Sequence, residues 1–178
     1  GGALSSLLLA ISMLMIANYL GVKDYGVIAL ITSTVFLVTG LFAFKTTEAV
    51  TKFLIDYLES NQLKKAGNLV AAGILVDFLS ALTASSILLI GSNQLVPFLF
   101  NSYEYINWFN LFSITPILGF CYATSLAVLR VADKFSLISA IDVSNAALTL
   151  LGNLYLVLNK AEWTSILIWM IIVSGIRG

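Results

Sequence analysis

The stretch YLGVKDYGVIAL, residues 19–30, separates two long apolar runs and contains one pair of opposite charges, Lys23 and Asp24. Gly21 and Gly26 flank this pair, and glycine accommodates the backbone conformations that tight turns require. The apolar run on each side is close to the roughly 20 residues that a helix needs to cross a membrane. We therefore expect a tight hairpin between two spanning helices, with Lys23 and Asp24 as solvated turn residues.

The composition is that of an integral membrane protein. Of the 178 residues, 60% are hydrophobic and 10% are charged, whereas a soluble domain carries about 25% charged residues. Nine basic and nine acidic residues cancel, so nothing points to a nucleic-acid partner. The chain has no histidine and one cysteine, Cys121, which excludes a disulfide framework, a Cys/His zinc site and histidine-based catalysis. We expect Cys121 to be a small core residue.

Six apolar runs have the length of a membrane span, which predicts a single all-α polytopic domain. The predicted spans are 3–20, 25–44, 66–90, 108–129, 135–158 and 163–178. Backbone groups have no water partners inside a bilayer, so these runs must be helices; the alternating ten-residue strands of a barrel are not seen. Because the chain begins with glycine and its last run has no polar tail, we expect a segment cut at both ends.

Basic residues alternate between the two sides of the predicted topology. The second and fourth connections and the end of the sixth span carry seven of them: Lys45, Lys52, Lys64, Lys65, Arg130, Lys134 and Arg177. The first, third and fifth connections carry Lys23 and Lys160. Since cytoplasmic loops are enriched in Lys and Arg, this alternation predicts a multi-pass protein with a cytoplasmic N-terminus.

Two connections have structure of their own. In the second, apolar residues from Ala49 to Leu58 recur at helical spacing opposite charged ones, so we expect the second helix to continue into an amphipathic extension. In the third, Pro97 precedes several aromatic residues, up to Trp108. That pattern predicts an interfacial segment in an aromatic belt.

Two carboxylates lie within predicted spans, Asp77 in the third and Asp142 in the fifth. An ionisable group at the bilayer centre costs about 2.5–3.5 kcal/mol on insertion scales, so both are candidate functional residues, and Asp77 is the stronger. Asn145, Thr149 and Asn153 continue the Asp142 face as a polar stripe. Such a stripe either lines a water-filled path or packs against another helix through hydrogen bonds, and packing is the simpler interpretation.

Lys45 and Arg130 lie at the predicted cytoplasmic ends of their spans. Each either extends its charge to the membrane surface or turns inward to hold an anionic headgroup. Pro116 can kink the fourth span and free a backbone carbonyl, or be an inert kink. No paired carboxylates, no serine–histidine–aspartate set and no phosphate-binding glycine loop occur, so we expect no enzyme and no metal site.

Three stretches together resemble a known family. They are YLGVKDYGVIALITSTVFLVTGLFAF (19–44), TTEAVTKFLIDYLESNQLKKAGNLV (46–70) and LRVADKFSLISAIDV (129–143). In order and topology they are similar to the oligosaccharide flippases of the multidrug/oligolipid/polysaccharide exporter superfamily, the O-antigen and capsule repeat-unit flippases. The shared features are an LG–DYG hairpin, a following apolar helix, and a later turn that begins with LR.

The resemblance implies two lobes with 12–14 helices, of which these six would be most of the N-terminal lobe. It implies translocation of undecaprenyl-diphosphate-linked oligosaccharide repeat units across the bacterial inner membrane by alternating access, driven by an ion gradient of H⁺ or Na⁺. Asp77 and Asp142 would couple the ion, while Lys45 and Arg130 would contact the headgroup. No Arg or Lys lies in mid-span, so the cation of the central cavity must be Lys45, Arg130, Arg177 or a residue outside this segment.

Two other functions stay open. One is a cation-coupled drug exporter of the same superfamily, with Asp77 as the counter-ion of a cationic drug. The other is a membrane subunit of a polysaccharide synthase with no transport of its own. The expected partners are membrane lipids, the polyprenyl-diphosphate-linked oligosaccharide and polysaccharide polymerase or synthase proteins; no cofactor is expected.

Overall fold

The computed structural model describes residues 2–43 and 46–177, and within them every regular element is a helix. The elements are α1 (Gly2–Phe42), α2 (Thr46–Glu59), α3 (Leu63–Phe100), α4 (Ile106–Phe112), α5 (Thr115–Leu118), α6 (Tyr122–Val131), α7 (Phe135–Leu158) and α8 (Trp163–Arg177). Four stretches are long and apolar enough to cross a membrane: α1, α3, the combined Ile106–Val131 and α7. The expected all-α membrane architecture is confirmed.

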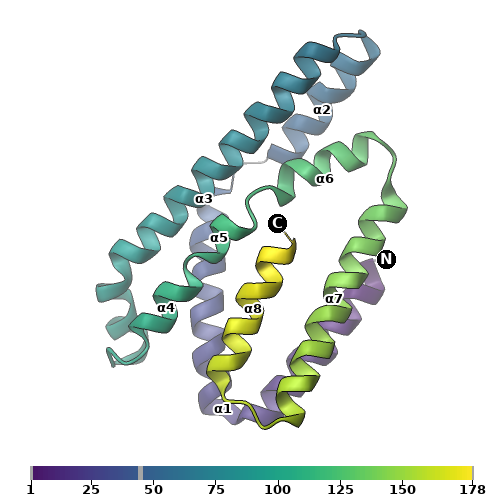
Figure 1. Cartoon of the computed structure of the whole chain (residues 1–178). Helices are drawn as coiled ribbons and strands as arrows, with labels where there is room; N and C mark the ends of the chain where they lie inside the picture. The colour runs from purple at the N-terminus through teal and green to yellow at the C-terminus, as the bar shows by residue number, and fades with distance from the viewer. Residues whose placement is uncertain (1, 44–45, 178) are drawn as a thin grey trace.

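Gly21 reverses the direction of α1. Its backbone angles, φ 74° and ψ 178°, interrupt an otherwise helical stretch of 41 residues. A residue with a side chain avoids this region, so the turn needs glycine. Figure 1 shows the two halves of α1 as the arms of a V. The expected hairpin is present, but Gly21 alone forms its turn: Lys23 and Asp24, expected as turn residues, are helical.

The amphipathic extension forms a separate helix. Ala43 is not helical, and α2 begins at Thr46. Val50 and Leu54 on the apolar face of α2 pack with Ala66 of α3 and Ala127 of α6 in a small buried cluster. Helices α2 and α3 thus form a hairpin, which extends at the upper right of Figure 1 beyond the other helices. We call that end of the bundle the hairpin end.

Helix α3 is longer than predicted. The expected span was 66–90 with an interfacial segment after it, but the helix runs on to Phe100. Gly91 does not end the helix, and Pro97, near its C-terminus, removes only one backbone hydrogen bond of the helix. Asn101 ends it, with φ 50° and its N–H on the Pro97 carbonyl at 2.9 Å. At about 1.5 Å per residue α3 is roughly 57 Å long, well over a hydrocarbon core of about 30 Å.

The fourth span is broken into three pieces. The predicted helix 108–129 is replaced by α4, α5 and α6, with breaks around Ser113 and between Gly119 and Cys121. Pro116 lies in the first turn of α5, where its missing N–H would have no helical partner in any case. The second break, between Gly119 and Cys121, separates α5 from α6 and sets where α6 begins.

Three helix ends share one backbone motif. Asn61, Asp133 and Lys160 follow α2, α6 and α7 with φ of 55°, 53° and 53°. In each case the next N–H reaches back five residues, namely Gln62 to Tyr57 at 2.8 Å, Lys134 to Leu129 at 2.9 Å and Ala161 to Leu156 at 2.9 Å. This is the Schellman motif, which satisfies the last helical carbonyls and reverses the chain within a few residues. It explains why these connections are so short.

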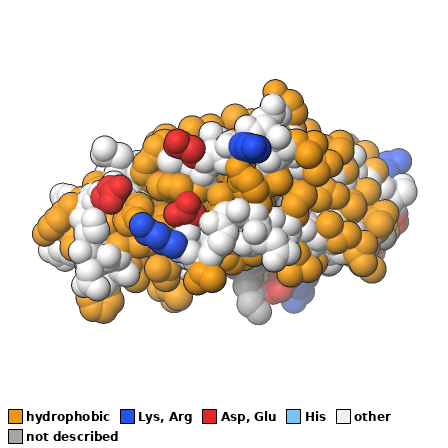
Figure 2. All heavy atoms as spheres, turned by 90° about the horizontal axis from the view of Figure 1, so that it is seen from below, with side chains coloured by type: hydrophobic (Ala, Val, Ile, Leu, Met, Phe, Trp, Pro, Cys, Tyr) orange, Lys and Arg blue, Asp and Glu red, His pale blue; other side chains and the backbone are white. Residues whose placement is uncertain are grey.

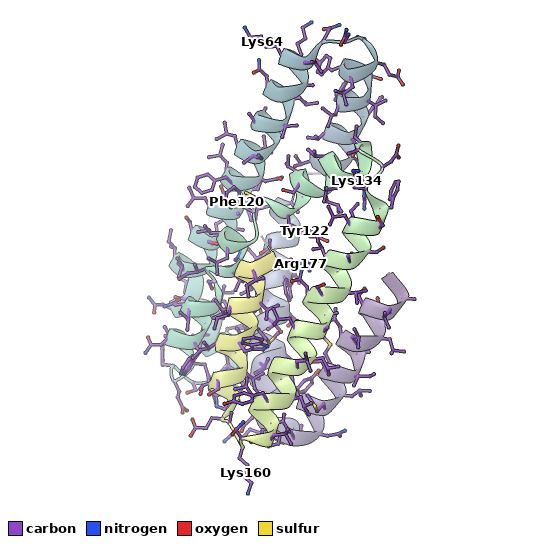
Figure 3. All side chains as sticks on the ribbon, turned by 45° about the vertical axis from the view of Figure 1, so that its right-hand side comes forward. Lys64, Phe120, Tyr122, Lys134, Lys160 and Arg177 are labelled. Carbon is purple, nitrogen blue, oxygen red and sulfur yellow. The ribbon has the colours of Figure 1, made fainter. Side chains whose placement is uncertain are left out.

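The outside of the bundle is apolar and its charges lie at the ends. Leu41, Ile90 and Phe98 are 75–82% exposed, as lipid-facing side chains would be. Seen from the end with the Gly21 turn, several acidic and basic side chains stand out among hydrophobic ones (Figure 2). Figure 3 shows Lys64 and Lys134 toward the hairpin end and Lys160 at the opposite end.

Candidate functional site

The first turn of α6 brings charged groups from two other helices together. Tyr122 donates a hydrogen bond from its hydroxyl to Oδ1 of Asp142 on α7 at 3.1 Å. The guanidinium of Arg177, at the end of α8, lies 4.2 Å from the centre of the Tyr122 ring. Figure 3 shows Tyr122 and Arg177 next to one another where α6 meets α8. We call Tyr122, Asp142 and Arg177 the Tyr122 site.

Three pockets adjoin this site and share Tyr122 as a lining residue. One of about 80 Å³ is lined by Asp142, Arg177 and apolar side chains of α6 and α7. A second of about 240 Å³ lies between α1, α5 and α8, again beside Arg177. A third of about 180 Å³ reaches Asp77 on α3. Tyr122 therefore stands where space opens toward several helices of the bundle.

The break before α6 explains why this space exists. Gly119 has no side chain and lines both of the larger pockets. A helix that starts inside the bundle also leaves N–H groups without helical partners, and these need acceptors when no water is present. The start of α6 is thus both an opening and a place that requires polar neighbours.

Asp77 supplies that acceptor. Its Oδ2 accepts the backbone N–H of Thr124 at 3.1 Å and the Thr124 hydroxyl at 2.6 Å. A carboxylate at a helix N-terminus also interacts favourably with the helix dipole. Gly73, one turn earlier on α3, faces the same threonine: a Cβ at that position would come within 3.0 Å of the Thr124 hydroxyl oxygen. Asp77 thus binds Thr124, and Gly73 leaves room for the Thr124 side chain.

The predicted headgroup cations are placed differently from one another. Lys45 lies outside the described residues. Arg130 is exposed in the last turn of α6 and is absent from the linings of the three pockets around Tyr122. Arg177 is also exposed, at the end of α8, but lines two of them. Among the cations proposed from the sequence, the structure brings Arg177 to the site.

The polar stripe on α7 separates from the Tyr122 site beyond Asp142. Asn153 is 1% exposed and donates from Nδ2 to the Ser12 hydroxyl oxygen of α1 at 2.8 Å. Thr149 donates to the carbonyl of Asn145 in its own helix at 2.7 Å. The Asn153 contact favours the helix-packing interpretation for that residue, whereas the Thr149 bond lies within α7 and does not distinguish packing from a water-filled path for Asn145 and Thr149.

Sequence reasoning did not identify Tyr122 and Thr124. The available signal was a tyrosine shortly after Pro116 and Gly119, because a proline and a glycine in one span predict broken helix and hence exposed backbone groups. Cys121, in the break itself, is a half-buried free thiol. Within residues 2–43 and 46–177 no cluster of three metal-ligating side chains occurs.

Comparisons with protein families, with curated proteins and with solved structures gave no match to this chain.

Proposed function

We propose that the chain is part of a flippase that moves undecaprenyl-diphosphate-linked oligosaccharide repeat units across the bacterial inner membrane. The product would supply surface polysaccharides such as O-antigen, capsule or exopolysaccharide. The observation that carries the proposal is the stacking of Arg177 on Tyr122 beside two pockets, within a helical bundle whose outer surface is apolar.

The Tyr122 site has the chemistry to hold a phosphate group. A guanidinium stacked on an aromatic ring keeps its N–H edge free, and that planar edge matches two phosphate oxygens. The hydroxyl of Tyr122 points to Asp142, so a polar pair stands next to the cation, where sugar hydroxyls could bond. Arg177 is exposed at the end of α8, so its guanidinium is accessible to a headgroup.

The basic residues favour a cytoplasmic hairpin end. Lys52, Lys64, Lys65, Arg130 and Lys134 belong to α2, the α2–α3 hairpin and the α6–α7 turn. With positive charge on the cytoplasmic side, the N-terminus would be cytoplasmic and a lipid headgroup in the inner leaflet would approach the Tyr122 site from that side. Asp142 is the better placed of the two carboxylates to couple H⁺ or Na⁺ to transport, since it lines a pocket together with Arg177.

The test is a translocation assay on the complete protein reconstituted in lipid vesicles that contain an undecaprenyl-diphosphate-linked oligosaccharide. Arg177→Ala should slow translocation by about tenfold, equivalent to roughly 1.4 kcal/mol. Lys134→Ala removes a cation from the α6–α7 turn instead and should leave the rate unchanged. Equal rates for wild type and Arg177→Ala would contradict the proposal. So would efflux of a cationic drug without lipid transport, or activity only in the presence of a synthase.

A further inference from the structure

We infer that Asp77 is a positioning residue: it holds the first turn of α6 so that Tyr122 faces Asp142 and Arg177. This inference rests on the proposed function, because it concerns the geometry of the same site. It gives Asp77 a role other than ion coupling, and it links the α2–α3 hairpin to the Tyr122 site.

The hydrogen bonds of Asp77 converge on one turn. Thr124 and Tyr122 are two residues apart at the start of α6. Both donors of Thr124, its N–H and its hydroxyl, reach the same atom, Oδ2 of Asp77. Loss of these bonds would release the N-terminal turn of a ten-residue helix, whose ends fray most readily. The direction of the Tyr122 side chain depends on that turn.

Two further contacts hold the same region from the hairpin side. The Thr47 hydroxyl of α2 donates to the carbonyl of Ala123 at 3.1 Å. In the break before α6, Phe120 packs edge-on against Phe78 of α3 at a centroid distance of 5.3 Å. In Figure 3 Phe120 and Tyr122 lie on opposite sides of the chain at this point. The start of α6 is therefore attached to both α2 and α3.

The atomic detail separates positioning from ion coupling. Since one oxygen accepts both bonds, the amide oxygen of an asparagine can take its place. Asp77→Asn keeps the acceptor and removes the charge, whereas Asp77→Ala removes both. A positioning role predicts that asparagine preserves function, while a coupling role predicts that it abolishes gradient-driven transport.

Cys121, the only cysteine of the chain, reports on this turn directly. It is the residue before Tyr122 and is half-buried. We would measure its rate of modification by a membrane-permeant maleimide in native membranes. Mass spectrometry of the Cys121 peptide would exclude signal from any other thiol. Thr83→Ala is the matched control, because Thr83 lies on α3 and its hydroxyl bonds only to Leu79 of the same helix.

Asp77→Ala should label about tenfold faster than wild type, a factor that corresponds to roughly 1.4 kcal/mol, close to the lower end for hydrogen bonds to a charged group. Asp77→Asn and Thr83→Ala should stay within about threefold of wild type. If Asp77→Ala does not accumulate, Thr124→Val removes the 2.6 Å bond alone and should label about threefold faster. Unchanged labelling of Asp77→Ala, or of Thr124→Val where that replaces it, would overturn the inference.

Labelling needs no substrate, so it tests the positioning role of Asp77 independently of the proposed transport function. If the wild type moves no lipid-linked oligosaccharide, the proposed function fails, and the labelling rates still show what Asp77 holds. In the transport assay, Asp77→Asn should keep the pH profile of the wild type while Asp77→Ala loses rate at every pH. An Asp77→Asn variant that labels normally but loses gradient-driven transport would establish coupling and refute positioning as the role of Asp77.

Discussion

The hydroxyl of Tyr122 and the carboxylate of Asp142 join α6 to α7 through a 3.1 Å hydrogen bond, next to the guanidinium of Arg177 from α8. The Tyr122 side chain thus contacts both of the helices that follow α6, namely α7 and α8. It can do so because the fourth span is interrupted just before it, which frees the first turn of α6 from a continuous helix. The interruption and the site are one structural feature.

The hydroxyl of Tyr122 is expected to contribute to transport apart from its ring. Tyr122→Phe removes the bond to Asp142 and keeps the surface on which Arg177 stacks. A net hydrogen bond contributes about 0.5–1.5 kcal/mol, so the translocation rate should fall by roughly twofold to tenfold. Tyr155→Phe, on an exposed part of α7, is the control. Wild-type rates for Tyr122→Phe would show that the hydroxyl plays no part.

Arg177 is expected to require its planar group. Arg177→Lys retains a positive charge but loses the stacked geometry and the paired N–H donors. The translocation rate should therefore fall by nearly the tenfold expected for Arg177→Ala. Full activity of the lysine variant would mean that charge alone suffices and that phosphate is not bound by the planar N–H edge.

Gly152 is expected to tolerate no side chain. A Cβ at this position of α7 would overlap the indole ring of Trp169 on α8. Overpacking of this kind costs about 1–3 kcal/mol, so Gly152→Ala should lower the melting temperature in detergent. The control is Gly26→Ala, which meets nothing within 4 Å and places a better helix former in α1.

A second substitution makes that test specific to the contact. If Trp169 is the cause, Gly152→Ala combined with Trp169→Leu should melt closer to the Trp169→Leu parent than Gly152→Ala does to the wild type. Equal effects of Gly152→Ala in both backgrounds would assign the loss of stability to something other than this ring.

The sequence predicted the fold well where a single residue determines the backbone conformation. The stretch from Gly21 to Gly26 predicted the first reversal, and of its residues Gly21 adopts the conformation that only glycine tolerates easily. The length of α3 was missed because Gly91 and the polar residues after it suggested an end. Their helical conformation is stabilised by packing, since Ser92 and Val96 are buried, and such tertiary stabilisation cannot be seen in a single stretch.

The candidate site was less predictable because it depends on contacts between distant residues. Asp77 and Asp142 stood out as carboxylates inside spans, and both take part in hydrogen bonds between helices. Their partners Thr124 and Tyr122 gave no comparable signal, since threonine and tyrosine are ordinary in membrane helices. Whether Arg130 or Arg177 lies beside Tyr122 and Asp142 depended on where α6 and α8 end, and hydropathy carries no such information.

Lys160 offers a test of the turn geometry at the end of α7. It is a residue with a side chain in the left-handed region, at φ 53°, where such residues are disfavoured by roughly 1–2 kcal/mol. Lys160→Gly should remove that cost. Glycine also has more conformational entropy in the unfolded state, which offsets part of the gain, so the net stabilisation should be about 0.5–1 kcal/mol. The melting temperature should then rise by about 1–4 °C. Lys160→Ala is the matched control: it also removes the charge and the long side chain but keeps the Cβ, so it should melt within about 1 °C of the wild type. A glycine variant that melts at or below the wild type would contradict the assignment of this cost to the left-handed conformation of Lys160.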